Sequence, residues 1–314
     1  MRRRFIVQEM VKQIIREEMY RSMKKYHFIS GLPASGQNIL AKILAQNPQM
    51  YASNSSPIID LMITTEQALN NNQLFAAYPD QQAGFRLVSS IITTNYKELQ
   101  ETIVFDRNML WPAFTHYIAG YVGEEPKVLC MVRNLAEVLA SMLAYAKASG
   151  DKSIDNALEA TGVPVENITD DMRAAFLSQA GIVGFAYSNL KTGVLSDKYK
   201  GLYFIDYNNL MQDPKAVLAG VYEFLGYPYY EHDYSIIDEY FAEIGDDLDS
   251  KNDVHEKHID PKSVLSENIL TAVAGAEFWK DVEAFREAQN TEAPNWNSDS
   301  EPDEFADSDT KLIG

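Results

Sequence analysis

An eight-residue loop near the N-terminus has the composition of an anion-binding site. Its residues are Gly31, Leu32, Pro33, Ala34, Ser35, Gly36, Gln37 and Asn38. The glycines let the backbone wrap closely, so successive N–H groups can point at an anion, and a helix that starts here adds its positive dipole end. The loop keeps the G-x-x-x-x-G frame of nucleoside-triphosphate-binding loops but lacks the Lys and the Ser or Thr that follow. The pattern indicates a phosphate site without ATP-dependent phosphoryl transfer, and a structural tight turn is the competing interpretation.

An arginine and a serine form a second candidate site. Arg133 follows a continuous apolar run, residues 127–132, which is typical of a strand buried on both faces of a parallel sheet. Ligands of open α/β sheets lie beyond the carboxyl ends of the strands, and a guanidinium can hold a phosphate through two hydrogen bonds. Ser141 lies two turns along the following helix and can add a hydroxyl donor. The alternatives are an ion pair between Arg133 and Glu137 and a packing role for Ser141.

Candidates for acid–base chemistry lie at the end of another expected strand. Asp106 closes the apolar run of residues 103–105 and is followed by Arg107. We expect Asp106 to be the catalytic base, with Arg107 beside it in the site. The alternatives for Asp106 are an ion pair with Arg107 or a helix cap, because Asp is a favoured N-cap residue. His116 could serve as the base instead, although a histidine on a helix is more often simply packed.

Other polar residues carry weaker signals. His27 lies in or beside the first expected strand and is expected to be structural, and Arg86 could line an anionic pocket or form a surface ion pair. His255 and His258 stand among acidic residues, but charged loops of this type are usually solvated, so we expect no metal site. The single cysteine, Cys130, excludes a disulfide framework and a multi-thiolate metal site.

Strands alternate with helices along the chain, which predicts how these residues are positioned. We expect an α/β fold, a three-layer sandwich with a mainly parallel central sheet. A more polar helical segment over residues 150–192 is expected to cover the site. The expected strands are residues 26–30, 102–106, 127–132 and 201–207, and the expected helices are residues 37–46, 135–146 and 216–225.

The composition limits the class of partner. Among 314 residues, 45 are acidic and 27 are basic, which gives a formal net charge of −18. This balance argues against general nucleic-acid binding, which needs a basic face, but it allows a small cationic pocket in an acidic exterior. No apolar run approaches the ~20 residues that span a membrane, and no secretory signal is present. We therefore expect a soluble, cytoplasmic protein without an integral membrane segment.

The two ends of the chain differ in charge from the rest. Residues 1–25 hold eight basic and three acidic side chains, a charge of +5, with apolar residues at near-helical spacing. This segment could be a basic amphipathic helix that binds a membrane or a partner, or an extra helix before the domain. Residues 289–314 hold seven acidic residues and one basic residue, a charge of −6, and are expected to be disordered. The α/β domain is expected to occupy residues 26–288.

Three segments resemble, in the same order, those of the sulfotransferases that use 3′-phosphoadenosine 5′-phosphosulfate (PAPS). Residues 28–36 look like the family's 5′-phosphosulfate loop, and Arg133 with Ser141 resembles its 3′-phosphate-binding segment. Residues 206–226, with Tyr207, resemble a stretch that we expect to be architectural. The resemblance covers roughly residues 26–282 and implies a P-loop-like sulfotransferase fold, PAPS as the donor and no metal. It also implies an acidic base at a strand end comparable to that of Asp106.

The departures from this family fall on the loop. Relatives usually carry Arg or Lys where this chain has Ala34, and Ser or Thr where it has Gln37 and Asn38. Loss of a comparable transition-state donor typically lowers the rate by ~10²–10³-fold. Lys42, on the next helix, could compensate for the cation that is missing at position 34. We expect sulfuryl transfer from PAPS to a hydroxyl or amine acceptor, weakened by Ala34. The alternatives are an inactive nucleotide- or anion-binding protein of the same fold and, less favoured, a P-loop small-molecule kinase. The sequence leaves the acceptor and the oligomeric state open.

Overall fold

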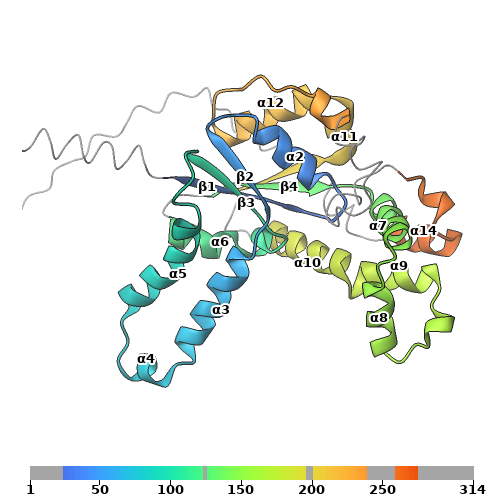
Figure 1. Cartoon of the computed structure of the whole chain (residues 1–314), viewed down its shortest axis with the longest axis horizontal. Coiled ribbons are helices and arrows are strands. Elements are labelled where there is room, and N and C mark those ends of the chain that lie inside the picture. The colour runs from blue at the N-terminus through green and yellow to red at the C-terminus, as the bar shows by residue number, and fades with distance from the viewer. Residues whose placement is uncertain (1–23, 123–125, 196–200, 239–258, 275–314) are drawn as a thin grey trace, which may run out of the picture. The chain divides into compact units, whose positions relative to one another are not determined.

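A five-stranded parallel sheet forms the centre of the structure, a computed structural model that describes residues 24–122, 126–195, 201–238 and 259–274 (Figure 1). All neighbouring strands are parallel, and their order across the sheet is β2-β3-β1-β4-β5. This arrangement confirms the expected α/β fold. The strands are β1 (Lys25–Gly31), β2 (Met50–Ser55), β3 (Ile103–Arg107), β4 (Val128–Val132) and β5 (Leu202–Asp206).

Helices pack against both faces of the sheet and so form the two outer layers. On one face lie α2 (Gln37–Leu44), α11 (Tyr207–Gln212) and α12 (Pro214–Leu225), and on the other lie α6 (Trp111–Val122) and α10 (Ile182–Leu195) (Figure 1). Because β1 lies between β3 and β4, the chain leaves β1 toward one edge and later returns to its other side. Such a reversal opens a crevice at the carboxyl ends of the strands, where ligands of α/β sheets bind.

The alternation of side chains along β1 and β3 decides which residues meet which helices. Ile29 packs with residues of α2 in the hydrophobic core, whereas the ring centroid of Phe28 lies 3.9 Å from that of Trp111 at the start of α6. In the register of these strands, Ile29 pairs with Arg107 and Phe28 pairs with Asp106. Arg107 therefore lies on the α2 face of the sheet and Asp106 on the α6 face.

Four of the five strands were predicted to within one residue at each end, and β2 was missed. Every residue of β3 and β4 is buried, as their continuous apolar runs indicate. In contrast β2 has the sequence MYASNS, is partly exposed and lies at an edge of the sheet, so it lacks an apolar strand pattern. Tyr207, which was expected to end a strand, instead begins α11.

Two groups of helices are inserted between the strands. Between β2 and β3 lie α3 (Ile58–Asn70), α4 (Gln73–Ala77) and α5 (Gln81–Asn95). Between β4 and β5 lie α7 (Leu135–Ser149), α8 (Ser153–Ala160), η1 (Val165–Asn167) and α9 (Asp170–Gln179), followed by α10. After β5 come η3 (Pro261–Ser263) and α14 (Glu267–Ala274).

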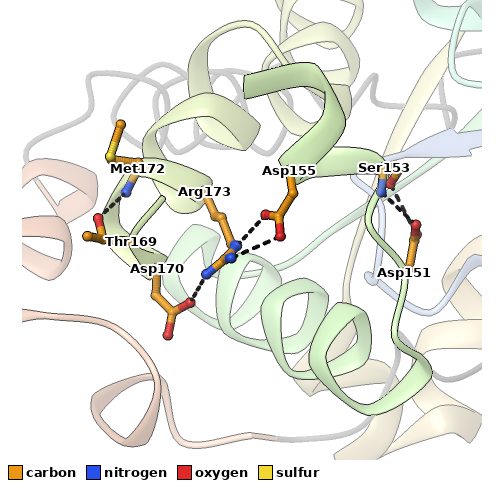
Figure 2. Close-up of polar contacts among 7 residues, drawn as sticks. All are labelled: Asp151, Ser153, Asp155, Thr169, Asp170, Met172 and Arg173. Carbon is orange, nitrogen blue, oxygen red and sulfur yellow. Dashed lines mark hydrogen bonds and ion pairs between the residues drawn. The ribbon is translucent and has the colours of Figure 1, made fainter. Parts of the chain in front are cut away.

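The helical segment expected over residues 150–192 is present. Figure 2 shows how Arg173 of α9 joins this helix to α8: its guanidinium pairs with Asp155 of α8 at 2.6 Å and with Asp170 of α9 at 2.7 Å.

Several predictions concern segments that lie outside the described residues. They are residues 1–23 of the basic extension, His255, His258 and the acidic tail. The last two residues of the extension, Lys24 and Lys25, are described, and Lys25 begins β1. The described elements all belong to one compact unit, Met1–Ala276. Within the described residues, no helix has the length and apolar character needed to cross a membrane. The same residues contain no group of three or more His, Cys, Asp or Glu side chains that could hold a metal ion.

Candidate functional site

The loop between β1 and α2 has a backbone that depends on glycine. Gly31, Ala34 and Gly36 have φ angles of 133°, 55° and 90°. A Cβ atom on Gly31 would lie 2.0 Å from the carbonyl oxygen of Met131, and one on Gly36 would lie 2.9 Å from the Tyr207 ring. Ala34 is the one non-glycine residue with positive φ among the described residues, a conformation that costs about 1–2 kcal/mol. The loop is thus wound tightly against β4 and α11.

Side chains of the loop hold its shape from within. The Ser35 hydroxyl is placed to donate to the carbonyl oxygens of Leu32 at 2.5 Å and Met131 at 3.2 Å, and the Gln37 amide donates to Leu32 at 2.9 Å. Gly36 is the N-cap residue of α2, and it has no side chain that could cap the helix. The first N–H groups of a helix have no intrahelical acceptor, so the start of α2 offers donors and a positive dipole end to an anion.

Arg133 and Ser141 come together with the loop. The Arg133 guanidinium is fully buried and donates to the Ala34 carbonyl at 2.9 Å and to the Ser141 hydroxyl at 3.4 Å. It also pairs with Glu137 at 3.0 Å. Arg133 therefore adjoins both the loop and Ser141, and the ion pair with Glu137 that was the alternative is present. Phosphate binding by Arg133 and Ser141 stays a prediction.

Tyr207, which was expected to be architectural, belongs to the same cluster. The guanidinium carbon of Arg133 lies 4.1 Å from the centre of the Tyr207 ring, within the range of a cation–π contact. The same ring limits the space at Gly36. Its position directly after Asp206, at the carboxyl end of β5, was the signal that could have placed it at this edge of the sheet.

The Asp106 carboxylate is enclosed in the core. The residue has no exposed surface, and its two oxygens accept hydrogen bonds from the Tyr96 hydroxyl at 2.5 Å and the Trp111 indole at 2.8 Å. Burial raises the pKa of this carboxyl above its ordinary value, while the hydrogen bonds oppose that shift. In this structure Asp106 therefore has no direct access to an acceptor. It lies on the α6 face, away from the loop face of β3.

Arg107, the next residue, lies on the loop face. Its guanidinium donates to the Asn38 side-chain oxygen and to the Ser55 hydroxyl, the latter at 3.3 Å. The main-chain N–H of Arg107 is also fixed, because it donates to the Ser53 hydroxyl at 2.9 Å. A cation from β3 thus reaches the start of α2, at the loop in which position 34 is alanine.

The contacts of Asn108, the residue directly after β3, were not predicted from the sequence. The Asn108 amide donates to the Ser56 carbonyl at 2.7 Å and to the Asp60 carboxylate at 3.1 Å. Asp60 is exposed and lies in the first turn of α3. Asp60 and Asn108 are 48 residues apart, so neither spacing nor composition links them, and only the pairing of β2 with β3 brings them together.

The other candidates occupy different positions. His116 is exposed on α6, and Arg86 is exposed on α5. Lys42 lies in the last turn of α2, at the end away from the loop. His27 is buried in β1, where the Lys127 N–H donates to its Nδ1 at 3.2 Å and its Nε2 lies 2.7 Å from the Tyr227 hydroxyl oxygen. The structure brings together residues 31–38 with Arg107, Arg133 and Ser141, and gives His27 a structural position.

Comparison with protein families identifies the relatives of this chain. The sulfotransferase domain family matches residues 24–243, which include the loop and both arginines. The chain belongs to the sulfotransferase family. This membership confirms the family resemblance that the three sequence segments indicated. None of the curated proteins compared with the sequence matches it.

Solved sulfotransferase structures are similar to this chain at low sequence identity. Mouse sulfotransferase SULT7A1 complexed with PAP is 12% identical, with 86% of this chain and 89% of that chain covered and a TM-score of 0.51. A sulfotransferase from Alicyclobacillus acidocaldarius is 14% identical, with coverage of 85% and 96% and a TM-score of 0.47. The sulfotransferase domain of the Synechococcus PCC 7002 olefin synthase is 17% identical, with coverage of 85% and 95% and a TM-score of 0.45. At these identities, the mouse structure supports the fold assignment alone.

Proposed function

We propose that this member of the sulfotransferase family transfers a sulfuryl group from PAPS to a hydroxyl or amine acceptor. The observation that carries the proposal is the contact of Arg107 with Asn38. Through it, a guanidinium from β3 stands at the anion-binding loop, although position 34 carries no charge. Sulfuryl transfer needs such a combination of backbone donors and positive charge around the transferred group.

In this proposal, the two anionic ends of PAPS bind to separate groups of residues. Residues 31–38 bind the 5′-phosphosulfate, and Arg133 with Ser141 binds the 3′-phosphate. Arg133 is already oriented by the Ala34 carbonyl and the Tyr207 ring, which reduces the entropy lost on binding. The 3′-phosphate replaces Glu137 as the anionic partner of Arg133, so binding exchanges one ion pair for another.

Arg107 supplies the positive charge that Ala34 lacks. Sulfuryl transfer, like phosphoryl transfer, proceeds through a loose in-line displacement, so catalysis depends on positioning and on stabilising the developing negative charge. The guanidinium stays protonated at all relevant pH values. Since Arg107 is only 7% exposed, solvent screens its charge weakly. Asn38 and Ser55 fix its orientation.

Asp106 acts in this proposal as a positioning residue. Its carboxylate holds Tyr96 and Trp111 against the end of β3 and thereby fixes the strand end from which Arg107 projects. Because its oxygens are engaged and enclosed, we do not assign it the removal of the acceptor proton. His116, exposed on α6, receives no role in the proposed reaction.

Ala34 favours a second candidate, a protein of the same fold that binds the nucleotide without turnover. The absence of a charged side chain at position 34 removes a donor from the sulfate end of the loop. This candidate predicts the same nucleotide binding as the first and no transfer. A P-loop kinase is disfavoured, because Gln37 and Asn38 replace the Lys and the Ser or Thr that such a loop uses for ATP and Mg²⁺.

Calorimetric titration with 3′-phosphoadenosine 5′-phosphate (PAP), PAPS and Mg-ATP tests the donor site. We expect PAP and PAPS to bind at least about 100-fold more tightly than Mg-ATP, because the 3′-phosphate adds a charge-assisted contact with Arg133. AMP, which lacks that phosphate, is the matched ligand. The Arg133→Gln variant, shown by circular dichroism to be folded, should lose most of the preference for PAP over AMP. Failure of the wild-type protein to bind PAP and PAPS would contradict the proposal and the nucleotide-binding alternative.

A further inference from the structure

The Asp60 carboxylate lies beside the strand end that carries the Arg107 cation. Its Oδ2 accepts a hydrogen bond from the Asn108 amide at 3.1 Å, and Asn108 directly follows Arg107. The Asn108 amide also donates to the Ser56 carbonyl at 2.7 Å, which fixes its orientation. Asp60 is therefore anchored to the end of β3 by a side chain whose own position is defined.

The same short segment after β2 contacts both groups. Ser55 accepts a hydrogen bond from the Arg107 guanidinium, the Ser56 N–H donates to the Arg107 carbonyl at 2.9 Å, and α3 with Asp60 begins at Ile58. The cation at the loop and the carboxylate on α3 are thus held in one polar cluster. Asp60 is exposed, so an acceptor arriving from solvent can reach its carboxylate.

Three other acidic residues near the carboxyl ends of the strands are committed elsewhere. Asp106 in β3 is enclosed and accepts hydrogen bonds from Tyr96 and Trp111. Glu137, in the first turn of α7, is paired with Arg133, and Asp206 at the end of β5 caps α11 by accepting from the Asn209 N–H at 3.0 Å. Of these four acidic residues, Asp60 is the one that combines exposure with a contact to the residue after Arg107.

We propose that Asp60 is the catalytic base of this protein, which takes the proton from the acceptor hydroxyl or amine. The inference rests on the proposed sulfuryl transfer from PAPS. As the acceptor atom forms its bond to sulfur, the bond between sulfur and the 5′-phosphate oxygen breaks, and its electron pair leaves with PAP. The proton of the acceptor passes to the Asp60 carboxylate. Asn108 is a positioning residue that holds this carboxylate beside Arg107.

The test measures transfer of ³⁵S from PAPS to 2-naphthol and to water by the full chain. Asp60→Asn should lower kcat by about 10²-fold or more, the usual contribution of a general base, with the PAP dissociation constant within about twofold of wild type. In Asp60→Ala, added formate should restore part of the rate, because it can replace the missing carboxylate. Asn108→Ala should lower kcat less than Asp60→Asn does. Glu66→Gln, on the same helix, is the matched control and should keep the wild-type rate.

The outcomes separate this proposal from the proposed function. If Asp60→Asn is folded, binds PAP and retains kcat within about threefold of wild type, Asp60 is not the base, while sulfuryl transfer stands. If the loss of rate in Asp60→Ala is not relieved by formate, Asp60 has only a structural role, and the assignment is overturned. If the wild-type protein binds PAP but transfers label neither to water nor to any member of a panel of phenols, aliphatic alcohols, amines and sugars, the proposed turnover fails and the base assignment fails with it.

Discussion

At the scale of single residues, the proposed site contains two buried arginines, to which the proposal assigns different anionic groups of PAPS. Arg133 is held by Ala34, Ser141 and Glu137 on one side of the loop. Arg107 reaches the loop from the other side through Asn38. A guanidinium buried with several partners is already oriented, so each charge acts at a fixed place. Loss of either should therefore affect a different part of the proposed reaction.

Replacing Arg107 tests whether its charge compensates for Ala34. Arg107→Ala should lower kcat for transfer from PAPS by ~10²–10³-fold, the usual cost of one transition-state donor, with a smaller effect on PAP binding. Ala34→Arg should raise turnover in the wild-type background and restore part of it in Arg107→Ala, because it returns a cation to the loop. Lys42→Ala, at the far end of α2, is the control and should leave the rate within about twofold. Full turnover by a folded Arg107→Ala variant would contradict the role given to this arginine.

At the scale of elements, a buried histidine ties β1 to two other parts of the domain. The Lys127 main-chain N–H donates to Nδ1 of His27, so the neutral ring carries its proton on Nε2 and donates to Tyr227. Burial, together with the nearby charges of Lys127 and Lys25, lowers the pKa of His27 to about 3. The fold thus requires the neutral ring.

This requirement predicts a loss of stability in acid. The folded-state pKa lies below the ordinary value of 6.5, so protons bind the unfolded chain more readily, and the stabilisation present above pH 6.5 is lost as the pH falls toward 3. Between pH 7.5 and pH 5, His27 alone should reduce the free energy of unfolding by about 2 kcal/mol. Urea unfolding of wild type and His27→Gln at both pH values measures this effect. The stability difference between the two proteins should shrink by that amount at pH 5, and an unchanged difference would refute the assignment.

The strands that could be predicted from the sequence are those with apolar runs. The central strands β3 and β4 are buried throughout, so their composition gave their type and nearly their ends. The edge strand β2 carries Ala, Ser and Asn, and only its pairing with β3 makes it a strand. The apolar pattern therefore predicted β5, at one edge of the sheet, as well as the central strands, and it missed only β2 at the other edge.

Within the proposed site, the placement of Arg133 beside the loop could be predicted, because both follow the carboxyl ends of neighbouring buried strands. The surroundings of Asp106 could not, because a strand end does not specify the face toward which a side chain points. Asp106 and Arg107 are consecutive, yet one turns to Trp111 and the other to Asn38. Tyr207 could have been placed at this edge from its position after β5, whereas Asp60 meets Asn108 through a contact between distant segments, for which a single sequence contains no signal.

At the scale of the whole molecule, an acidic chain buries two arginines at one small site. The formal net charge is −18, and two of the arginines are buried at the carboxyl ends of the strands. Such a charge distribution suits a compact nucleotide with two anionic ends and repels long polyanions. The proposed acceptor is accordingly a small or weakly charged molecule, not nucleic acid or a heavily sulfated polymer.

Transfer of ³⁵S from labelled PAPS across a panel of hydroxyl and amine acceptors tests the central claim most directly. The panel includes phenols, aliphatic alcohols, amines and sugars, and the unlabelled PAP formed is quantified in parallel. We predict that label appears in at least one acceptor with one PAP released for each sulfuryl group transferred. A protein that binds PAP in the calorimeter yet transfers label to no acceptor, with the Ala34→Arg variant equally inactive, would contradict the proposed enzyme and support the inactive nucleotide-binding alternative.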